Sequence, residues 1–418
     1  MPLALLDFSH RVDFGVQFNQ FLWPVMEHVG RWYRGLTRKR QSVVVVVGSL
    51  GKTTTTRSLM QVLQGKTPHW IHAWDNCFSL VSFNLMRQGL WKRWAVLEVG
   101  IGRKGQMKRY VPLLQPDIVV VTAIASDHQR DLGGPEGVWQ EKAEMVRALG
   151  ADGWAVLNGD DANVLRMGTI TRARIRTFGF HASCDVYAAD QETGPEGSRF
   201  HLHAEGRTIP VRSRLIGCAA VRAQLAAVAV GRLCGLSFDA IKQRLETQEP
   251  TPGRMQPIVL QSGAIALCDD FKGSFETFHA ALDVLSPIRG GNRVVVLGGL
   301  YQPPAPRLSR YIKIGQHLSE SADRVILLGN HTGLYRRYLH GALKEKENGV
   351  TVARTVGEAV QQLRAELRAG DVVLLKGRGE QKLSRIAHEL AGKKVDCRLA
   401  FCTFENVLCQ DCPKLARG

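Results

Sequence analysis

The sequence predicts an α/β protein with two domains, and three observations lead to this fold class. Val43–Val47 is an unbroken β-branched run, which is typical of a strand buried on both faces of a parallel sheet. A glycine-rich segment and a helical pattern follow it directly, and strand and helix patterns then alternate. The alternation starts again at Val294–Leu297, so we expect a larger central domain and a smaller second one within the 418 residues.

Composition narrows the class of protein. Hydrophobic residues make up 44% of the chain and charged residues 22%, which excludes a wholly disordered protein. No apolar run approaches the roughly 18–20 residues of a membrane-spanning helix, so we expect a cytoplasmic protein. The formal net charge of +17 fits a bound nucleotide and an acidic small molecule, and it does not require a nucleic acid.

The first predicted element is an amphipathic helix over residues 14–36. Its apolar residues recur at helical spacing with one interruption at Pro24, and Arg38, Lys39 and Arg40 follow without a balancing acid. Such a segment can make peripheral contact with a membrane surface, or its aromatic residues can pack against the next domain. The second interpretation is favoured, because Trp and Tyr are common packing residues, and membrane contact stays the alternative.

The next predicted elements build the two domains. After Val43–Val47, strands are expected at 95–99, 118–121 and 154–157, and helices over 217–247. The second domain is expected to contain strands at 294–297, 324–328 and 371–375. The predicted boundaries are a basic leader at 1–41, a central domain at 42–252, a C-terminal domain at 253–392 and a cysteine-rich tail at 393–418.

A glycine turn between the first strand and the following helix has the composition of a phosphate-binding loop, in the short Gly-x-x-Gly-Lys-Thr form. Backbone N–H groups converge at a helix N-terminus, where the helix dipole adds partial positive charge. Lys52 would reach the terminal phosphates of a nucleotide, and the Thr53 hydroxyl would bind Mg²⁺. The sequence therefore predicts a P-loop NTPase-like central domain that binds ATP and Mg²⁺. The residues expected to bind the nucleotide are Gly48, Ser49, Gly51, Lys52, Thr53 and Thr54.

Polar side chains at the ends of the neighbouring strands are expected beside this loop. Glu98 ends one predicted strand, and Asp127-His128 follows the next. Ligands of open α/β sheets gather at the carboxyl ends of the strands, so Glu98 would meet the metal of the loop. For His128, a metal or phosphate role is favoured over that of an ordinary structural histidine.

Nine short segments, in the same order and near the same spacing, resemble the Mur ligase family of ATP-dependent enzymes that join a carboxylate to an amine. Within the family, the resemblance is strongest to the member that adds D-alanyl-D-alanine to the muramoyl tripeptide. The second domain is then similar to the Rossmann-like C-terminal domain of the family. The segments are Gly48–Thr55, Leu97–Gly100, Asp127–His128, Glu141–Glu144, Leu157–Asp161, Thr177–Gly179, Pro252–Met255, Asp269–Lys272 and Gly370–Gly377.

The resemblance implies that ATP phosphorylates a substrate carboxylate, that an amine attacks the acyl phosphate, and that ADP and phosphate are released. Lys142 matches a lysine that many members carry as a carbamate, which gives the metal an extra carboxylate ligand. The catalytic residues implied are Lys52, His128 and Lys142. The Mg²⁺ ligands implied are Thr53, Glu98, His128 and Lys142. The further nucleotide contacts implied are Asn158, Arg254, Asp270 and Lys272.

The sequence departs from the family pattern at two places, which concern the binding of the substrate and of the nucleotide. Only 42 residues precede Val43, fewer than an ordinary domain of roughly 50–200 residues, so a domain that binds a UDP-sugar is not expected. The stretch Gly217–Gln224 lacks the His and the two Asn residues with which family members contact adenine. Two alternatives therefore stay open: a chain-elongating ligase of the poly-γ-glutamate or cyanophycin type, and a non-catalytic nucleotide-binding subunit of a biosynthetic complex. The substrates are expected to be a small carboxylate and an amine, and the sequence identifies neither them nor the oligomeric state.

Four of the nine cysteines lie in the last 22 residues, namely Cys397, Cys402, Cys409 and Cys412. Their spacing is C-x4-C-x6-C-x2-C, and only the last pair matches a common zinc knuckle. Four thiolates suffice for a tetrahedral zinc site, which is the favoured prediction. An iron–sulfur cluster and free thiols are the alternatives.

Overall fold

The computed structural model describes residues 9–66, 76–125, 132, 134–300, 307–329, 349–402, 407–412 and 414–415. Side chains are described from residue 21 onward in α1 (Ser9–Thr37) and from residue 309 onward in α11 (Arg307–Ser321). The chain forms two compact units. The first comprises residues 1–191, 199–212 and 219–248, and the second comprises 192–198, 213–218 and 249–418.

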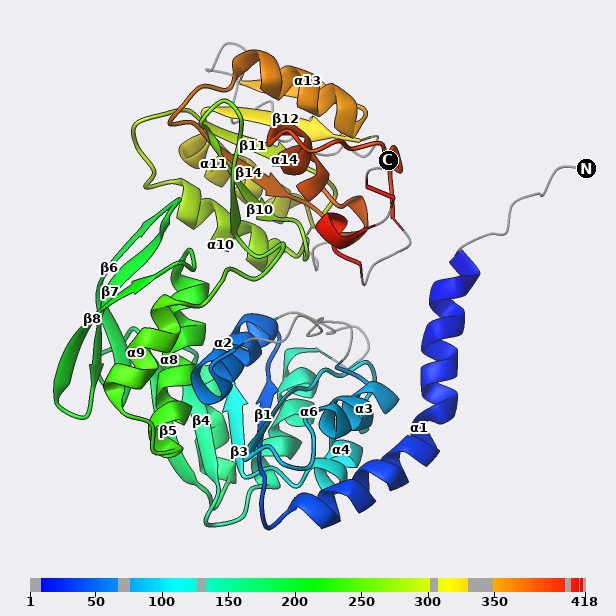
Figure 1. The fold of residues 1–418 in the computed structure, drawn as a ribbon, viewed down its shortest axis with the longest axis vertical. Helices are drawn as coiled ribbons and strands as arrows, with labels where there is room; N and C mark the ends of the chain where they lie inside the picture. Colours follow the sequence, from blue (N-terminus) through cyan, green and yellow to red (C-terminus); the bar gives the residue numbers. More distant parts are fainter. Residues whose placement is uncertain are drawn as a thin grey trace, which may run out of the picture. The chain divides into compact units, whose positions relative to one another are not determined.

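The first unit is built on an eight-stranded sheet with the order β2-β1-β3-β4-β5-β6-β7-β8 (Figure 1). Neighbouring strands run parallel from β2 as far as β6. The strands are β1 (Ser42–Val47), β2 (Trp94–Glu98), β3 (Ile118–Val121), β4 (Trp154–Asn158), β5 (Arg174–Gly179), β6 (Val186–Gly194), β7 (Gly197–Ala204) and β8 (Arg207–Ser213). The carboxyl ends of β1 to β4 therefore share one edge of the sheet.

Helices cover both faces of this sheet, and the valines of β1 show how. Val43, Val45 and Val47 pack into the core beneath α1, α3, α4 and α6, whereas Val44 and Val46 pack beneath α2, α8 and α9. All five side chains are completely buried, which explains why this strand has no polar face. The helices are α2 (Lys52–Gln64), α3 (Ser79–Arg87), α4 (Gln106–Leu114), α6 (Pro135–Arg147), the short α7 (Ala162–Leu165), α8 (Cys218–Leu233) and α9 (Phe238–Glu246).

The second unit repeats this layered arrangement on six strands, in the order β13-β12-β11-β14-β10-β9. All neighbouring pairs are parallel except β10 and β9. Side chains of β11 alternate between a core under α10 and α11 and a core under α13 and α14. The remaining elements are β9 (Gln256–Val259), β10 (Ile265–Asp269), α10 (Phe275–Leu285), β11 (Arg293–Leu297), β12 (Arg324–Leu328), β13 (Val350–Ala353), α13 (Val356–Glu366), β14 (Val372–Lys376) and α14 (Ser384–Leu390).

The predicted fold class is confirmed: two α/β units, the larger with a mostly parallel sheet. The strands expected from apolar runs are β1 to β4, β11, β12 and β14. The helical stretch expected over 217–247 is two helices, separated by a turn in which Gly235 has a φ of 82°. The sequence patterns did not indicate β5 to β10 or β13, because several of these strands alternate buried and exposed residues or carry polar side chains.

The N-terminal helix is present and packs on the first unit, which is the interpretation that the sequence favoured. Trp23 and Tyr33 are buried, and the Trp23 ring meets the Tyr110 ring edge-on with 5.2 Å between centroids. A Cβ atom at Gly30 would lie 2.3 Å from a Leu113 methyl group, so glycine lets α1 approach α4 closely. Residues 1–41 thus belong to the same compact unit as the large sheet.

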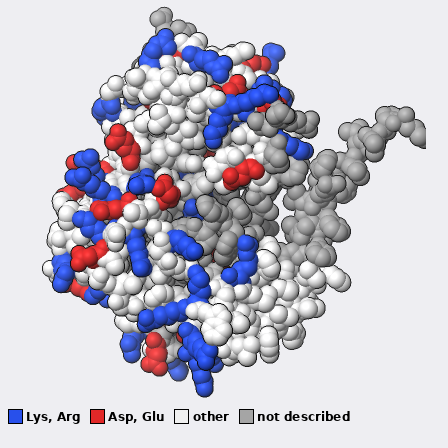
Figure 2. Space-filling view, in the orientation of Figure 1, with Lys and Arg blue, Asp and Glu red and all other residues white. Residues whose placement is uncertain are grey.

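Charge is distributed without one dominant basic stripe on the face drawn in Figure 2. Lys and Arg side chains occur over both units there, with Asp and Glu among them. Among the described residues, no helix combines the length and the apolar character needed to cross a membrane.

Candidate functional site

The loop after β1 has the backbone of a phosphate-binding turn. Gly48 has a φ of 147°, and a Cβ atom there would lie 2.0 Å from the Thr122 hydroxyl oxygen, so only glycine fits against the end of β3. Gly51, with a φ of 80°, precedes α2 and offers no side chain to cap its first turn. Two hydrogen bonds connect the loop to the residues that follow β3. The Ser49 N–H donates to the Ala123 carbonyl at 2.7 Å, and the Thr122 hydroxyl donates to the Leu50 carbonyl at 2.6 Å.

The N-cap residue of α2 makes no side-chain cap hydrogen bond, as at α3, α4 and α6, whereas four other helices are capped by a side chain. Asp161, Ser237, Ser274 and Thr355 each accept hydrogen bonds at the start of their helices. At α2 the first-turn N–H groups and the helix dipole instead face the glycine loop. Together with the sequence order of strand, loop and helix, this favours binding of an anion such as a nucleotide phosphate.

The structure brings Lys142 to the loop. Lys142 lies on α6, is 2% exposed, and donates from Nζ to the Ser49 hydroxyl oxygen at 2.9 Å. A lysine flanked by acids on a helix is usually a solvated charge, but burial excludes that interpretation here. The contact joins two residues that are 93 positions apart in the chain.

Glu141 fixes the orientation of α6 and therefore the direction of Lys142. Its two carboxylate oxygens accept hydrogen bonds from the backbone N–H groups of Gly105 at 2.8 Å and Met107 at 2.7 Å. These N–H groups belong to the first turn of α4, so the carboxylate caps that helix from a neighbouring element. The sequence signal was present in the Glu141–Glu144 segment, but spacing alone did not separate the capping residue from the functional one.

Glu98 ends β2 in the register position beside Val46 of β1, next to the loop. Asn76 donates from Nδ2 to Glu98 Oε1 at 2.8 Å. The other oxygen, Oε2, is buried and has no hydrogen-bond partner within the described part of the chain. An unsatisfied buried carboxylate oxygen at the strand end next to a phosphate-binding turn suits a hard cation such as Mg²⁺, so Glu98 fits the predicted metal. Thr53 lies in the first turn of α2. Sequence reasoning missed Asn76, because no pattern marks a residue that orients a ligand from outside.

Cys77 lies close enough to Lys52 and Glu98 for their charges to act on it. Burial raises the pKa of the Cys77 thiol to about 12, against a smaller opposing effect of Lys52. The thiol is therefore protonated at neutral pH and is not prepared for nucleophilic chemistry.

Asn158 is at the expected sheet edge, but its polar atoms are engaged in the fold. Nδ2 donates to the Thr122 carbonyl at 2.7 Å, and Oδ1 accepts from the Asp160 N–H at 3.1 Å. It joins the ends of β3 and β4, which supports the loop indirectly through Thr122. His128 and Asp127 lie outside the described residues.

The remaining predicted nucleotide contacts lie in the second unit. The Arg254 guanidinium stacks over the Phe271 ring at 4.6 Å from its centroid. Asp270 is 4% exposed, and burial raises the pKa of its carboxyl group although the Ser384 N–H donates to it at 2.7 Å. The Lys272 carbonyl accepts from Lys376 Nζ at 2.9 Å. The stretch Gly217–Gln224 forms the start of α8 and includes the exposed Cys218.

The four tail cysteines do not form a metal site in this structure. Among the described residues, which include all four, no three His, Cys, Asp or Glu side chains are grouped to hold one ion. The zinc prediction therefore gains no support from the geometry.

Fold and loop together define an α/β protein with a phosphate-binding turn and a carboxylate at the adjoining strand end. The family model of the Mur ligase middle domain matches residues 46–231, and the model described as Mur ligase, glutamate ligase domain matches residues 253–379. The chain belongs to the Mur ligase family.

Named relatives and solved structures agree with this assignment. The UDP-N-acetylmuramoyl-tripeptide–D-alanyl-D-alanine ligase of Escherichia coli is 27% identical over 69% of this chain and 65% of its own length. The enzyme of that name from Bacillus subtilis is 26% identical over 83% of this chain and 75% of its own. Among structures, MurF from Acinetobacter baumannii aligns with a TM-score of 0.74 at 23% identity, covering 88% of this chain and 80% of that one. MurF from Thermotoga maritima in complex with ADP aligns with a TM-score of 0.72 at 20% identity, covering 85% and 80%.

Proposed function

We propose that this protein is an ATP-dependent ligase that joins a carboxylate to an amine. The observation that carries the proposal is the convergence of Lys142, Ser49 and the glycine loop at the carboxyl edge of the large sheet. Family membership supports it, as do relatives named as ligases that couple a tripeptide precursor to D-alanyl-D-alanine.

The reaction we propose has two steps. The substrate carboxylate attacks the γ-phosphorus of ATP, which releases ADP and leaves an acyl phosphate. The amine then attacks the acyl carbon, expels phosphate and loses a proton. A carboxylate is a poor electrophile, and the first step supplies the leaving group that it lacks.

The residues of the first unit have distinct roles in this proposal. The first-turn N–H groups of α2 and the Lys52 ammonium bind and orient the phosphates. Thr53, Glu98 and His128 would hold Mg²⁺, which neutralises phosphate charge when bound. Asn76 orients Glu98 through its 2.8 Å hydrogen bond. Arg254, Asp270 and Lys272 are proposed nucleotide contacts of the second unit.

Lys142 is proposed to act as a carbamate formed with CO₂. The reaction converts an amine into a carboxylate, a group that attracts Mg²⁺ where an ammonium would repel it. The burial of Lys142 and its 2.9 Å hydrogen bond to the Ser49 hydroxyl of the loop support this proposal.

The two alternatives differ in their support. The chain-elongating type is not favoured, because the relatives are named for one defined addition. The non-catalytic subunit is weakened by the buried Lys142 and the unsatisfied Glu98 oxygen, which a purely structural loop does not require. A structural zinc in the tail stays a prediction outside this proposal, and metal analysis of the purified chain tests it.

ADP release by the purified chain tests the proposal. We expect ADP release to require a carboxylate and Mg²⁺, and repeated turnover to require an amine as well, across a panel that includes peptides, amino acids and D-alanyl-D-alanine. With the amine replaced by hydroxylamine, the acyl phosphate should be trapped as a hydroxamate. Formation of AMP and pyrophosphate would show that the carboxylate is activated by adenylation and would contradict the proposal. A ladder of product masses would favour the chain-elongating type.

A further inference from the structure

α1 exposes an apolar stripe on the side opposite its buried face. Phe21, Val25, Trp32 and Leu36 are 79%, 63%, 68% and 57% exposed, and Val29, between them, is 37% exposed. Intervals of three and four residues align them along one side of the helix. The buried face, in contrast, includes the charged Glu27 and Arg34. Surface helices normally have the reverse arrangement, with apolar residues inside and charges outside.

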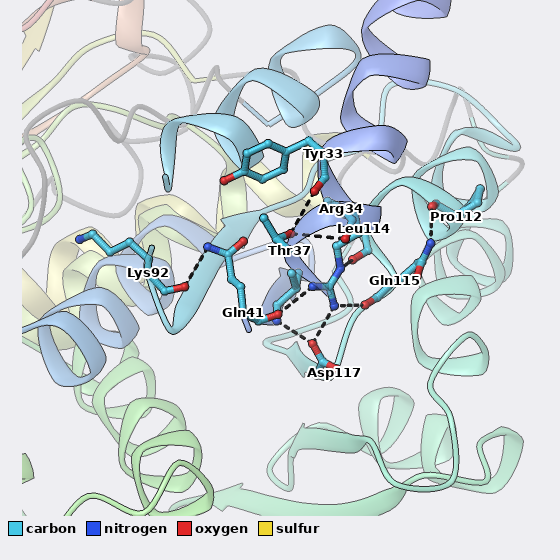
Figure 3. Close-up of polar contacts among 10 residues, drawn as sticks. Tyr33, Arg34, Thr37, Gln41, Lys92, Pro112, Leu114, Gln115 and Asp117 are labelled. Carbon is cyan, nitrogen blue, oxygen red and sulfur yellow. Dashed lines mark hydrogen bonds and ion pairs between the residues drawn. The ribbon is translucent and has the colours of Figure 1, made fainter. Parts of the chain in front are cut away.

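The buried charges fix this orientation of the helix. Arg34 is completely buried, and its guanidinium donates to the carbonyls of Leu114, Gln41 and Gln115 and to the Asp117 carboxylate, over 2.7–3.0 Å (Figure 3). Turning the apolar stripe inward would remove the guanidinium from these acceptors and leave the carbonyls of Leu114, Gln41 and Gln115 without their donor. The stripe is therefore held outward by the fold.

A second exposed apolar segment lies beside the end of α1. Phe83 and Leu90 are each 46% exposed and Trp91 is 86% exposed. Gln41, which follows the end of α1, is hydrogen-bonded to this segment. Its Nε2 donates to the carbonyls of Gly89 at 3.0 Å and Lys92 at 3.1 Å. Two parts of the chain thus contribute apolar side chains to one region of the first unit.

The charges in both segments have one sign. Residues 28–40 and 76–93 contain no Asp or Glu, and their exposed charged residues are Arg31, Arg38, Lys39, Arg40, Arg87, Lys92 and Arg93. Glu27, the acid closest in sequence to α1's basic end, is buried and paired with Arg31 at 2.5 Å and Arg109 at 2.6 Å.

We propose that this surface, which we call the α1 face, binds an anionic lipid membrane. Exposed tryptophans beside lysines and arginines suit the boundary between lipid head groups and acyl chains, and negative head groups complement the positive charge. A second copy of this chain would bring the same positive segments into contact, which like-charge repulsion disfavours. The proposal does not depend on the ligase activity.

Flotation of the purified full-length chain with lipid vesicles tests this. We expect binding to phosphatidylglycerol vesicles, weak binding to phosphatidylcholine vesicles, and weakening with added salt. Val25→Glu with Trp32→Glu should reduce binding to phosphatidylglycerol vesicles at least tenfold without changing the melting temperature, because both side chains are exposed. The matched control is Val259→Glu, 69% exposed on β9 of the second unit, which should bind like the wild type.

Charge-reversal variants separate the contribution of the basic residues to vesicle binding from that of the apolar residues. Arg38→Glu with Lys39→Glu should abolish the preference for phosphatidylglycerol over phosphatidylcholine. No binding to phosphatidylglycerol vesicles, or equal binding by the Val25→Glu, Trp32→Glu variant, would overturn the proposal. A dimer in sedimentation velocity that this variant dissociates, without vesicle binding by the wild type, would assign the α1 face to a second copy instead.

Discussion

The carboxyl edges of the two sheets each have a buried lysine, but its partners differ. At the edge of the first sheet, Lys142 donates to Ser49 of the glycine loop. At the edge of the second sheet, Lys376 is completely buried and contacts the Asp269 carboxylate at 2.5 Å across neighbouring strands. Burial lowers the pKa of Lys376, and Asp269 opposes that shift. One lysine supports a turn suited to an external anion, and the other is joined to the strand beside it.

The glycine turns at these two edges also differ in whether their backbone N–H groups are available to an anion. In the second unit, the Gln381 side-chain oxygen accepts from the Gly299 N–H at 2.7 Å and from the Arg378 N–H at 3.2 Å. The chain's own amide thereby occupies the donors that a phosphate would need. In the first unit, the first turn of α2 has no side-chain cap. The comparison shows that parallel-sheet geometry alone does not make a phosphate site, because the donors must also be left available.

The largest expected effect is on stability, at Lys376. Lys376→Met should leave Asp269 buried without its cation and reduce the free energy of unfolding by roughly 3–5 kcal/mol. Denaturant unfolding of the full chain measures this. The double variant Asp269→Asn, Lys376→Met should recover much of the loss; if it is as unstable as the single variant, the ion pair is not what stabilises this edge.

At the other edge, the expected effect is on catalysis. Lys52→Ala should reduce ADP release on the order of 10²–10³-fold, because the ammonium stabilises charge that develops on the phosphates. Lys66, exposed just beyond the other end of α2, is the matched control, and Lys66→Ala should retain full activity. Equal turnover by the two variants would contradict the assignment of the loop.

A smaller effect is expected where Asn76 orients Glu98. Asn76→Ala should raise the Mg²⁺ concentration for half-maximal ADP release roughly 10–100-fold, because residues behind a metal ligand tune its affinity. Asn163→Ala, at an exposed position of the same unit, is the control. An unchanged Mg²⁺ dependence would mean that Glu98 is not a metal ligand.

A further prediction concerns pH and the second unit. Burial lowers the pKa of His388 from 6.5 to about 4, so below pH 6.5 the unfolded chain binds a proton that the folded chain excludes. Stability should therefore fall as pH decreases from about 6.5 to 4, by at most about 1.4 kcal/mol per pH unit from this group. Melting temperatures of wild type and His388→Gln across this range provide the measurement, and parallel curves would contradict the assignment.

Elements that depend on the residues of one short segment could be predicted from the sequence. The run Val43–Val47 and the residues Gly48–Thr55 define strand, loop and helix locally, and the structure has these elements in that order. The sequence could not predict contacts between residues that only the tertiary fold brings together. Asn76 meets Glu98 22 positions away, and Arg34 meets Asp117 83 positions away, with no local pattern for either pair. The crowding of four of the nine cysteines into the last 22 residues did indicate a cluster, but among the described residues the fold does not group them for a metal.

Lys142 tests the central claim, that the edge of the first sheet is built for metal-assisted transfer of phosphate from ATP. The decisive measurement is ADP release by Lys142→Ala, with and without added short carboxylic acids, at a temperature where its melting curve shows a folded protein. We predict that most activity is lost, that formate or acetate partly restores it, and that Lys142→Arg is not restored, because its fixed charge occupies the space of the carboxylate. Near-wild-type turnover by Lys142→Ala without any added acid would contradict the claim.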